Sequence, residues 1–472
     1  MLTIGLFLVG LLLTYYMYWI NKWRNPKCNG ILPPGSMGFP LIGETLQLLT
    51  TSYSLDLHPF IKKRVQRYGP IFRSNVAGRP IVVSTDPEFN HYILGQEERL
   101  VEIWYLDTFS KLFLSESRIN SAGYIHKYIR SFFLSNFGSE NLKEQLLPQI
   151  EDMINKTLRS WSNQPSVDVK YFASVAVCDF TAKIFFSYDA EKLPEKLSET
   201  FAKFIEGLIS FPLNIPGTAY HQCLQDHRKA MSILKKIIVE RRNTVEKRGA
   251  DVLDRCLNDM EKEKFLTDDF ICMLMFGGLF ASSESISSIT TLMFKFLSAH
   301  PEVVQELKAE HVKILKNKKG SDPSSITWEQ YKSMTFTHQV INETLRLGNV
   351  VPGLLRKAIK DFQFKGYTIP ANWTIMMVTS ACQINPDVYK DPLVFNPWRW
   401  KDIGSAILSK NFTPFGKGTR QCAGAEFSKV TLSVFLHVLV TKYRWTMIKE
   451  AEVRRDPILG FGDGIQIKLV EN

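Results

Sequence analysis

The feature that most constrains the fold is a long apolar stretch that follows Thr267 and ends at Pro301. Thr267 is a good N-terminal cap, and the two aspartates after it place negative charge where a helix dipole favours it. A helix between these two signals spans about 50 Å, which is long for a globular protein. Its flanks at 270–280 and 289–297 are apolar on every side, so we expect it to run through the protein core.

The centre of this helix departs from the apolar pattern, because residues 281–288 read Ala-Ser-Ser-Glu-Ser-Ile-Ser-Ser. A carboxylate and several hydroxyls in a buried helix need partners or water. Two interpretations remain open: a solvated patch, or a wet active-site groove. In the groove, Glu284 beside Ser285 would pair an acid with an alcohol to relay protons. The hydroxyls could also compete for the helix's own carbonyls and open it locally.

The N-terminus carries a second apolar run, with no charged side chain from Leu2 to Ile20. A helix of that length spans about 28 Å, close to the hydrocarbon thickness of a bilayer. Basic residues follow at once and no small-residue cleavage site closes the run, which favours a retained signal-anchor with the rest of the chain in the cytosol. We therefore expect a membrane anchor at 1–21, a basic, proline-rich hinge at 22–36 and a globular domain at 37–472.

Composition excludes several classes of protein. The chain has 472 residues, of which 45% are hydrophobic and 22% charged, which is typical of a globular protein and excludes a disordered or polytopic one. The net charge of +11 suits nucleic acid, an acidic membrane surface or an acidic partner protein, and composition does not choose among them. The seven cysteines are widely spaced without a CxxC pair, so reduced thiols are expected rather than disulfides or a zinc module.

Shorter patterns indicate one mainly helical α+β domain with small sheets. Residues 88–347 are mostly helical in pattern, and Thr327 with Gln330 forms a capping box. A turn at Gly78 joins two short β-patterned runs into a hairpin. Short strands are expected at 71–75, 81–84, 362–369, 374–379 and 464–470.

The most informative stretch is segment 415–424, which reads Phe-Gly-Lys-Gly-Thr-Arg-Gln-Cys-Ala-Gly. Its glycines allow close backbone approach to a flat ligand, and it leads into an apolar helix at 425–440. The N-terminus of that helix would stabilise a thiolate at Cys422, and Arg420 could pair with an anionic group. A phosphate-binding loop is excluded, because Gly-Lys is followed by Gly and Asn411 stands where the first Gly should be.

This segment resembles the haem-thiolate signature of the cytochrome P450 family, Phe-x-x-Gly-x-Arg-x-Cys-x-Gly, at every fixed position. The resemblance covers the whole chain and implies the cytochrome P450 fold, with 37–472 as the haem-thiolate catalytic domain. It implies haem b, with Cys422 as the axial ligand of the iron. The same resemblance assigns cofactor contacts to Phe415, Arg420 and Gly424.

Two further motifs match the family. Glu343 and Arg346 fit its Glu-x-x-Arg motif, and with Arg399 they look like its buried Glu-Arg-Arg triad, a structural network whose loss should be costly. Taken alone, charges at i,i+3 on a helix are more simply a surface ion pair. The central helix resembles the oxygen-activating segment, in which Glu284 and Ser285 would deliver protons.

The chain also departs from the family pattern. Ser282, Ser285 and Ile286 stand where the family usually has Gly, Thr and Thr or Ser. Ser285 keeps the hydroxyl but lacks the methyl that restricts its rotamer, which leaves its effect on coupling open. Many relatives hold a haem propionate with a Trp-x-x-x-Arg pair. The residues here that match that pair and a further propionate contact are His126, Arg130 and Arg356.

The resemblance implies a membrane-bound monooxygenase that uses O2 and two electrons. No nicotinamide or flavin motif occurs in the chain, so the electrons are expected from an NADPH-cytochrome P450 reductase. Lys417 and Lys429 near the cysteine loop could dock such an acidic partner, or be ordinary solvated lysines. We expect a monomer in the endoplasmic reticulum membrane, single-pass, with a cytosolic catalytic domain and no nucleic acid partner.

The substrate class is inferred from finer likeness. Segment 210–218 is similar to a loop of the plant members that oxidise sterols, brassinosteroids and triterpenoids. Ring hydroxylation and multi-step side-chain oxidation or cleavage both remain open. Each expected pocket residue could equally be plain core; they are Trp104, Leu106, Leu208, Phe280, Ala281, Val351, Leu354 and Leu459.

Two hypotheses from other functional classes compete with a sterol or triterpenoid monooxygenase. A haem-dependent isomerase or dehydratase would rearrange its substrate without O2 or reductase, and such enzymes often lack the acid–alcohol pair present at Glu284 and Ser285. A non-catalytic haem- or sterol-binding protein would not need a hydrophilic centre in its long helix. Both are disfavoured by these residues.

Overall fold

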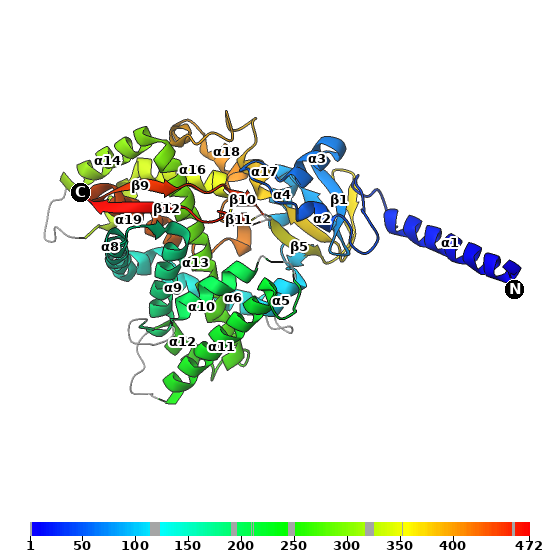
Figure 1. The fold of residues 1–472 in the computed structure, drawn as a ribbon, viewed down its shortest axis with the longest axis horizontal. Helices are drawn as coiled ribbons and strands as arrows, with labels where there is room; N and C mark the ends of the chain where they lie inside the picture. Colours follow the sequence, from blue (N-terminus) through cyan, green and yellow to red (C-terminus); the bar gives the residue numbers. More distant parts are fainter. Residues whose placement is uncertain are drawn as a thin grey trace.

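The computed structural model describes residues 2–113, 123–189, 196–208, 210, 212–243, 251–316, 325–351, 353–455 and 458–472. At the N-terminus, α1 (Leu2–Arg24) stands away from the rest of the molecule as a single helix (Figure 1). It continues beyond the boundary expected at residue 21, and Lys22 and Arg24 lie in its last turn. Large apolar side chains along it, such as Phe7, Leu12 and Met17, are exposed.

A five-stranded sheet lies next to α1 and has the strand order β1-β2-β8-β5-β3. The predicted hairpin is confirmed, with Ile71 paired to Ser84 and a turn at Ala77-Gly78 in which both residues have positive φ. Only β2 and β8 run parallel within this sheet. Its strands are β1 (Ile71–Val76), β2 (Arg79–Ser84), β3 (Val101–Ile103), β5 (Leu354–Ala358) and β8 (Thr374–Met377).

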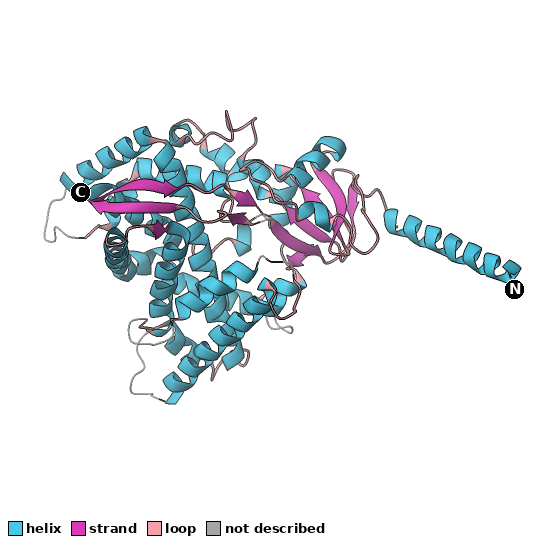
Figure 2. Ribbon diagram, in the orientation of Figure 1, coloured by secondary structure: helices cyan, strands magenta, loops and turns pink. Residues whose placement is uncertain are grey.

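The remaining strands form three smaller sheets, and Figure 2 shows the strands gathered at separate places in a largely helical molecule. The strand expected at 362–369 is two strands, because Lys365 and Gly366 turn with positive φ. The final strand is confirmed close to its expected bounds. These strands are β4 (Val167–Asp168), β6 (Phe362–Phe364), β7 (Tyr367–Ile369), β9 (Tyr443–Lys449), β10 (Arg454–Arg455), β11 (Leu459–Gly460) and β12 (Gln466–Glu471).

Helices make up most of the rest of the described chain, which confirms the mainly helical prediction. Short helices accompany the large sheet: α2 (Thr45–Leu48), α3 (Pro59–Tyr68), α4 (Pro87–Leu94) and α5 (Asp107–Phe113). The helical body contains α6 (Tyr124–Phe137), α7 (Ser139–Asn141), α8 (Leu147–Ser162), α9 (Val169–Phe186), α10 (Leu197–Leu208), α11 (Ala219–Asn243), α12 (Val252–Asp259), α13 (Asp268–Ala299), α14 (Pro301–Lys316), α15 (Trp328–Ser333), α16 (Thr335–Gly348), α17 (Thr379–Gln383), α18 (Ser405–Asn411) and α19 (Ala425–Lys442).

The long helix predicted from the sequence is α13, and it runs through the main core as expected. The Thr267 hydroxyl accepts the backbone N–H of Phe270 at its start, as the capping argument requires. It packs against α9, α11, α16 and α19, and apolar residues on its flanks, including Phe276 and Leu292, are fully buried. By length and composition α13 could also cross a membrane, but half of its most apolar stretch is buried inside the protein, as in a core helix.

The polar centre of α13 does not interrupt the helix. Its hydroxyls donate to carbonyls one turn earlier, as Ser283 does to Leu279 (2.6 Å) and Thr291 to Ser287 (2.7 Å). The same carbonyls keep their places in a continuous α-helix. The local opening considered from the sequence is therefore absent from this part of the described chain.

Candidate active site

The cysteine loop is held in shape by its glycines. Gly416 and Gly418 have φ of 69° and 75°, and a side chain at Gly418 would lie 2.8 Å from the Leu94 carbonyl oxygen. The Cys422 N–H donates to the Phe415 carbonyl (2.9 Å), which closes the loop just before α19. Of the seven cysteines, Cys422 is the exposed one, so the loop presents its thiol at an accessible surface.

The thiol of Cys422 is accessible, yet protein surrounds it closely enough to favour the neutral form. Burial raises its pKa, while the Gly424 N–H and the charge of Arg130 oppose that shift. The sequence argument counted only the helix N-terminus and so expected a stabilised thiolate. Desolvation by the surrounding chain is the larger of these effects on the Cys422 pKa.

Basic residues from three separate parts of the chain meet beside this loop. Arg130 on α6 donates to the Gln421 carbonyl, which joins α6 to the cysteine loop. Arg356 on β5 donates from Nε to Glu97 Oε2 (2.6 Å). Arg420 Nε lies 3.4 Å from the other oxygen, Glu97 Oε1. Two guanidinium groups therefore flank the Glu97 carboxylate, and a third, that of Arg130, contacts the cysteine loop beside them.

His126 belongs to the same cluster. Burial lowers its pKa to about 4, and the neighbouring charges of Arg420 and Arg130 act in the same direction. The imidazole is therefore neutral at pH 7 and can donate one hydrogen bond without adding charge. Tyr105 also lies here, and its pKa is raised by burial against the opposing charges of Arg356 and Arg420.

The acid and the alcohol predicted on α13 point to different surroundings. Ala281 is exposed and Ser285 partly exposed, whereas Glu284 is buried. The Glu284 carboxylate lies 2.8 Å from Lys170 Nζ on α9 and accepts a hydrogen bond from Ser288 (3.2 Å). The acid–alcohol pair expected from the sequence is therefore not in contact here, because the ion pair turns Glu284 toward α9.

Lys170 explains most of the polar centre of α13. Its ammonium donates to the Ser287 hydroxyl (2.9 Å), the Ser288 hydroxyl (2.8 Å) and the Glu284 carbonyl (3.2 Å). Burial lowers the pKa of Lys170, and the charge of Glu284 opposes that shift. On one face of the polar centre of α13, the polar groups are therefore bonded to α9. On the other face, Ala281 and Ser285 are accessible.

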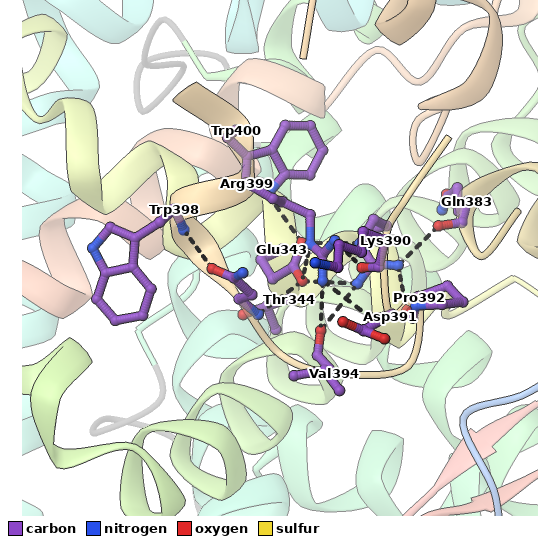
Figure 3. Close-up of polar contacts among 12 residues, drawn as sticks. Glu343, Thr344, Gln383, Lys390, Asp391, Pro392, Val394, Trp398, Arg399 and Trp400 are labelled. Atoms are coloured by element: carbon purple, nitrogen blue, oxygen red, sulfur yellow. Dashed lines mark hydrogen bonds and ion pairs between the residues drawn. The ribbon is translucent and has the colours of Figure 1, made fainter. Parts of the chain in front are cut away.

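The structure brings Glu343, Arg346 and Arg399 together in a buried network. Figure 3 shows Glu343 with Arg399 and Trp400 around it. Arg346 donates from Nε and Nη2 to the two Glu343 oxygens (2.9 and 2.7 Å). Arg399 Nε donates to Glu343 Oε1 (3.0 Å), and Trp400 Nε1 donates to Oε2 (3.0 Å). Since Glu343 and Arg346 are both 0% exposed, the alternative of a surface ion pair is wrong.

The predicted pocket residues divide into accessible and core positions. Leu106, Ala281 and Val351 are exposed, while Trp104, Leu208, Phe280 and Leu354 are partly buried. Leu354 lies beside the cysteine loop, because a side chain built at Gly416 would meet it at 3.9 Å. Leu459 is 1% exposed within the main core, so the prediction that it lines a pocket is wrong. Residue 211 of segment 210–218 lies outside the described residues.

The family profile described as "Cytochrome P450" matches residues 33–463 of the chain. The match covers most of the sequence and includes every element described above around Cys422. The chain belongs to the cytochrome P450 family. As a cytochrome P450 monooxygenase it uses haem b, molecular oxygen and electrons supplied by a redox partner.

Curated relatives and a solved structure agree with this assignment. The chain is 54% identical to "Cucurbitadienol 11-hydroxylase" of Siraitia grosvenorii, over 99% of each chain. It is 49% identical to "Beta-amyrin 16-alpha-hydroxylase CYP87D16" of Maesa lanceolata, over 99% of this chain and 98% of the relative. Retinoic acid-bound cyanobacterial CYP120A1 superposes with a TM-score of 0.81 at 26% identity, over 94% of this chain and all of the other.

The residues beside Cys422 fit a haem group. The buried Arg420 Nε and Glu97 Oε1 have no hydrogen-bond partner among the described residues, so this cluster is not saturated from within the protein. Its three guanidiniums suit the carboxylates of a haem, and the accessible Cys422 sulfur suits its iron. The ligand set expected from the sequence stays a prediction.

Two residues at this site were not predicted from the sequence. Glu97 and Lys170 belong to no motif, and each is a charged residue in an otherwise ordinary stretch. Their partners lie 259 and 114 positions away along the chain, at Arg356 and Glu284. Only the folded chain reveals such pairs.

Proposed function

We propose that this cytochrome P450 hydroxylates a ring carbon of a tetracyclic or pentacyclic triterpenoid. The similarity over nearly the full chain to two enzymes named for hydroxylation of cucurbitadienol and beta-amyrin supports this choice most strongly. A relative named "Cholesterol 22-hydroxylase CYP90B27" of Paris polyphylla is only 37% identical. Ring hydroxylation is thus favoured over oxidation or cleavage of a sterol side chain.

In this proposal the residues around Cys422 hold the cofactor. The Cys422 sulfur binds the iron, and Arg130, Arg356, Arg420 and His126 donate to its carboxylates. Phe415, at the start of the cysteine loop, packs against the main core. Lys429 Nζ lies 5.7 Å from the centre of its ring. The haem supplies oxygen activation, while the chain orients a C–H bond of the substrate and excludes bulk water.

Ser285 is the proposed proton-delivering alcohol, with Glu284 as the acid behind it. Ser285 is partly exposed, and its hydroxyl makes no hydrogen bond to any described residue. That hydroxyl is therefore free to bind water. Glu284 stands one residue away on the same helix but is bound to Lys170. Proton transfer from Glu284 toward Ser285 then requires water between them or release of the Lys170 contact.

We further propose that the chain is anchored to the endoplasmic reticulum membrane through residues 1–21, with 22–36 as the hinge and 37–472 as the cytosolic catalytic domain. The exposed apolar face of α1 and the basic residues at its end support this orientation. The chain that follows adds exposed apolar side chains suited to a lipid surface: Ile31, Phe39, Leu41, Ile42 and Leu46.

The redox partner proposed is the membrane-bound NADPH-cytochrome P450 reductase, with the chain itself monomeric. Lys417 and Lys429 lie on the cysteine loop and the start of α19, on the Cys422 side of the molecule. Basic side chains there suit an acidic partner that must bring electrons near the iron. Each lysine alone contributes little, since exposed charges are screened by salt.

The function is tested by expressing the full chain in microsomes with the reductase and feeding cucurbitadienol, beta-amyrin and cholesterol separately. We expect a product one oxygen heavier from a triterpene, with NMR placing the hydroxyl on a ring, and no product without reductase. Cys422→Ala is the inactive control. A product formed without reductase would favour an isomerase or dehydratase, and a cleaved side chain would overturn the ring assignment.

Proton delivery is tested separately by measuring how much of the consumed NADPH appears as product. Ser285→Ala should lower this coupling, because the accessible hydroxyl is lost. Lys170→Met is the matched probe of the Glu284 contact, and it should change coupling while leaving the Cys422 loop untouched. Unchanged coupling in Ser285→Ala would assign proton delivery to another group.

A further inference from the structure

Glu97 occupies an unusual position for a carboxylate. It follows α4 in a short turn, and its side chain is 5% exposed. Arg356, also 5% exposed, donates to one of its oxygens at 2.6 Å, and Arg420 lies 3.4 Å from the other. Glu97 thus separates two cations that would otherwise face each other in a poorly hydrated site.

Both arginines keep N–H groups that Glu97 does not use. Arg356 donates from Nε to Glu97 and from Nη1 to the Leu355 carbonyl (2.8 Å), so its Nη2 has no partner in this pair of bonds and can donate to a ligand. Arg420 Nε faces Glu97 Oε1 at 3.4 Å, and the Nη atoms of Arg420 make no hydrogen bond to a described residue, so both remain available. When one edge of a planar guanidinium pairs with a carboxylate, the N–H groups on its other edge can donate to a second carboxylate.

The charges of this cluster also balance in a particular way. Arg356, Arg420 and Glu97 together carry a net charge of +1, and Arg130, which contacts the neighbouring Gln421 carbonyl, adds one more positive charge beside the loop, giving +2. His126 is neutral at pH 7. The carboxylate of Glu98 is exposed and accepts the Gly123 N–H (2.8 Å). Its charge acts on Arg420 and His126 as the smallest cause at each, and solvent and salt screen it. The two carboxylates of a haem carry the matching −2.

We propose that Glu97 is a positioning residue for the cofactor: it holds the Arg356 and Arg420 guanidiniums side by side and sets the charge of their site to match the two haem carboxylates. The inference depends on haem binding at Cys422 and not on the substrate. Its test therefore uses no substrate, and it can fail while the proposed hydroxylation stands.

The test compares Glu97→Gln with Glu98→Gln in the haem-loaded full chain. The first readout is the rate of haem transfer to excess apomyoglobin. We expect Glu97→Gln to lose haem at least about tenfold faster, because the two guanidiniums repel each other and lose their fixed placement. Glu98→Gln should change the rate much less, since its carboxylate is exposed and its charge near Arg420 is screened. Equal rates in both variants would overturn the proposal.

The second readout is the ferric–ferrous midpoint potential, which a purely structural role would not move. Removing one buried negative charge from the cofactor site should raise the potential in Glu97→Gln and move it much less in Glu98→Gln, whose charge is exposed and screened. Glu97→Asp keeps the charge and should restore the potential, even where its shorter side chain restores haem retention only in part. A potential that stays the same in Glu97→Gln would show that Glu97 does not act on the cofactor site.

Discussion

Two clusters in this protein have the same composition, one glutamate and two arginines, and opposite character. In the first, every oxygen of Glu343 is occupied by Arg346, Arg399 or Trp400. In the second, Glu97 binds Arg356 closely and leaves one oxygen of its own and the Nε of Arg420 without a hydrogen bond among the described residues. The first network is closed, and the second is open.

The difference shows where each network does its work. A closed buried network locks chain segments together, because removing any member strands a charge that water cannot reach. Its donors come from α16, which carries Arg346, and from the 3₁₀ helix Pro397–Lys401, which carries Arg399 and Trp400, both labelled in Figure 3. An open network beside an accessible cysteine retains donors for a ligand. We therefore expect substitutions in the first to affect folding and substitutions in the second to affect the cofactor.

The largest effect is expected for Glu343→Gln. It leaves Arg346, which is 0% exposed, without a counter-charge, and should lower the free energy of unfolding by about 3–5 kcal/mol. Urea unfolding of the haem-loaded chain measures this. Glu102→Gln is the control, because Glu102 pairs loosely with Lys357 at 3.7 Å and should cost about 0–1 kcal/mol. Similar losses in the two variants would mean that the network is not closed.

A smaller effect is expected for Arg399→Lys. Arg399 donates to Glu343 and also to the carbonyls of Lys390 (2.6 Å), Asp391 (3.2 Å) and Val394 (3.0 Å). Lysine keeps the charge but cannot reach all four acceptors, so the free energy of unfolding should fall by about 1–3 kcal/mol. The same urea titration checks it. An unchanged free energy of unfolding with lysine would show that the positive charge alone, and not the several donors of the guanidinium, stabilises the network.

In the open network, Arg356→Gln should separate stability from cofactor binding. Glu97 keeps Arg420 as a counter-charge, so we expect unfolding of the haem-free chain to change by only about 1 kcal/mol. Haem transfer to apomyoglobin should nevertheless become faster, because one donor to the carboxylates is lost. A large loss of stability without faster haem transfer would place Arg356 in a structural role like that of Arg346.

The smallest effect concerns pH. The folded-state pKa of His126 is about 4, below its ordinary value of 6.5, so the unfolded chain binds a proton that the folded chain does not. This contribution makes stability fall as the pH drops from about 6.5 to about 4. His126→Asn should flatten that part of the pH–stability curve, measured by urea unfolding at pH 7 and pH 5. An unaltered slope would show that His126 is solvated like an exposed histidine.

The sequence predicted the parts of the fold that rest on local signals. The Thr267 cap, the length of α13, the Gly78 hairpin and the start of α19 after the cysteine loop all follow from neighbouring residues. The burial of Leu459 in the core and the turning of Glu284 away from Ser285 were not predictable in the same way. Each depends on which distant segment packs against it, and chain spacing alone carries no information about that.

The sequence by itself therefore determined the family, the cysteine that faces an accessible surface and the residues of the Glu343 network, because these lie in short motifs with fixed spacing. Only the tertiary structure decided the partners of the charges. Glu97 meets Arg356 and Arg420, and Lys170 meets Glu284, across long stretches of chain. A buried charge must find its counter-charge wherever the fold places one, and that choice is made in space rather than along the chain.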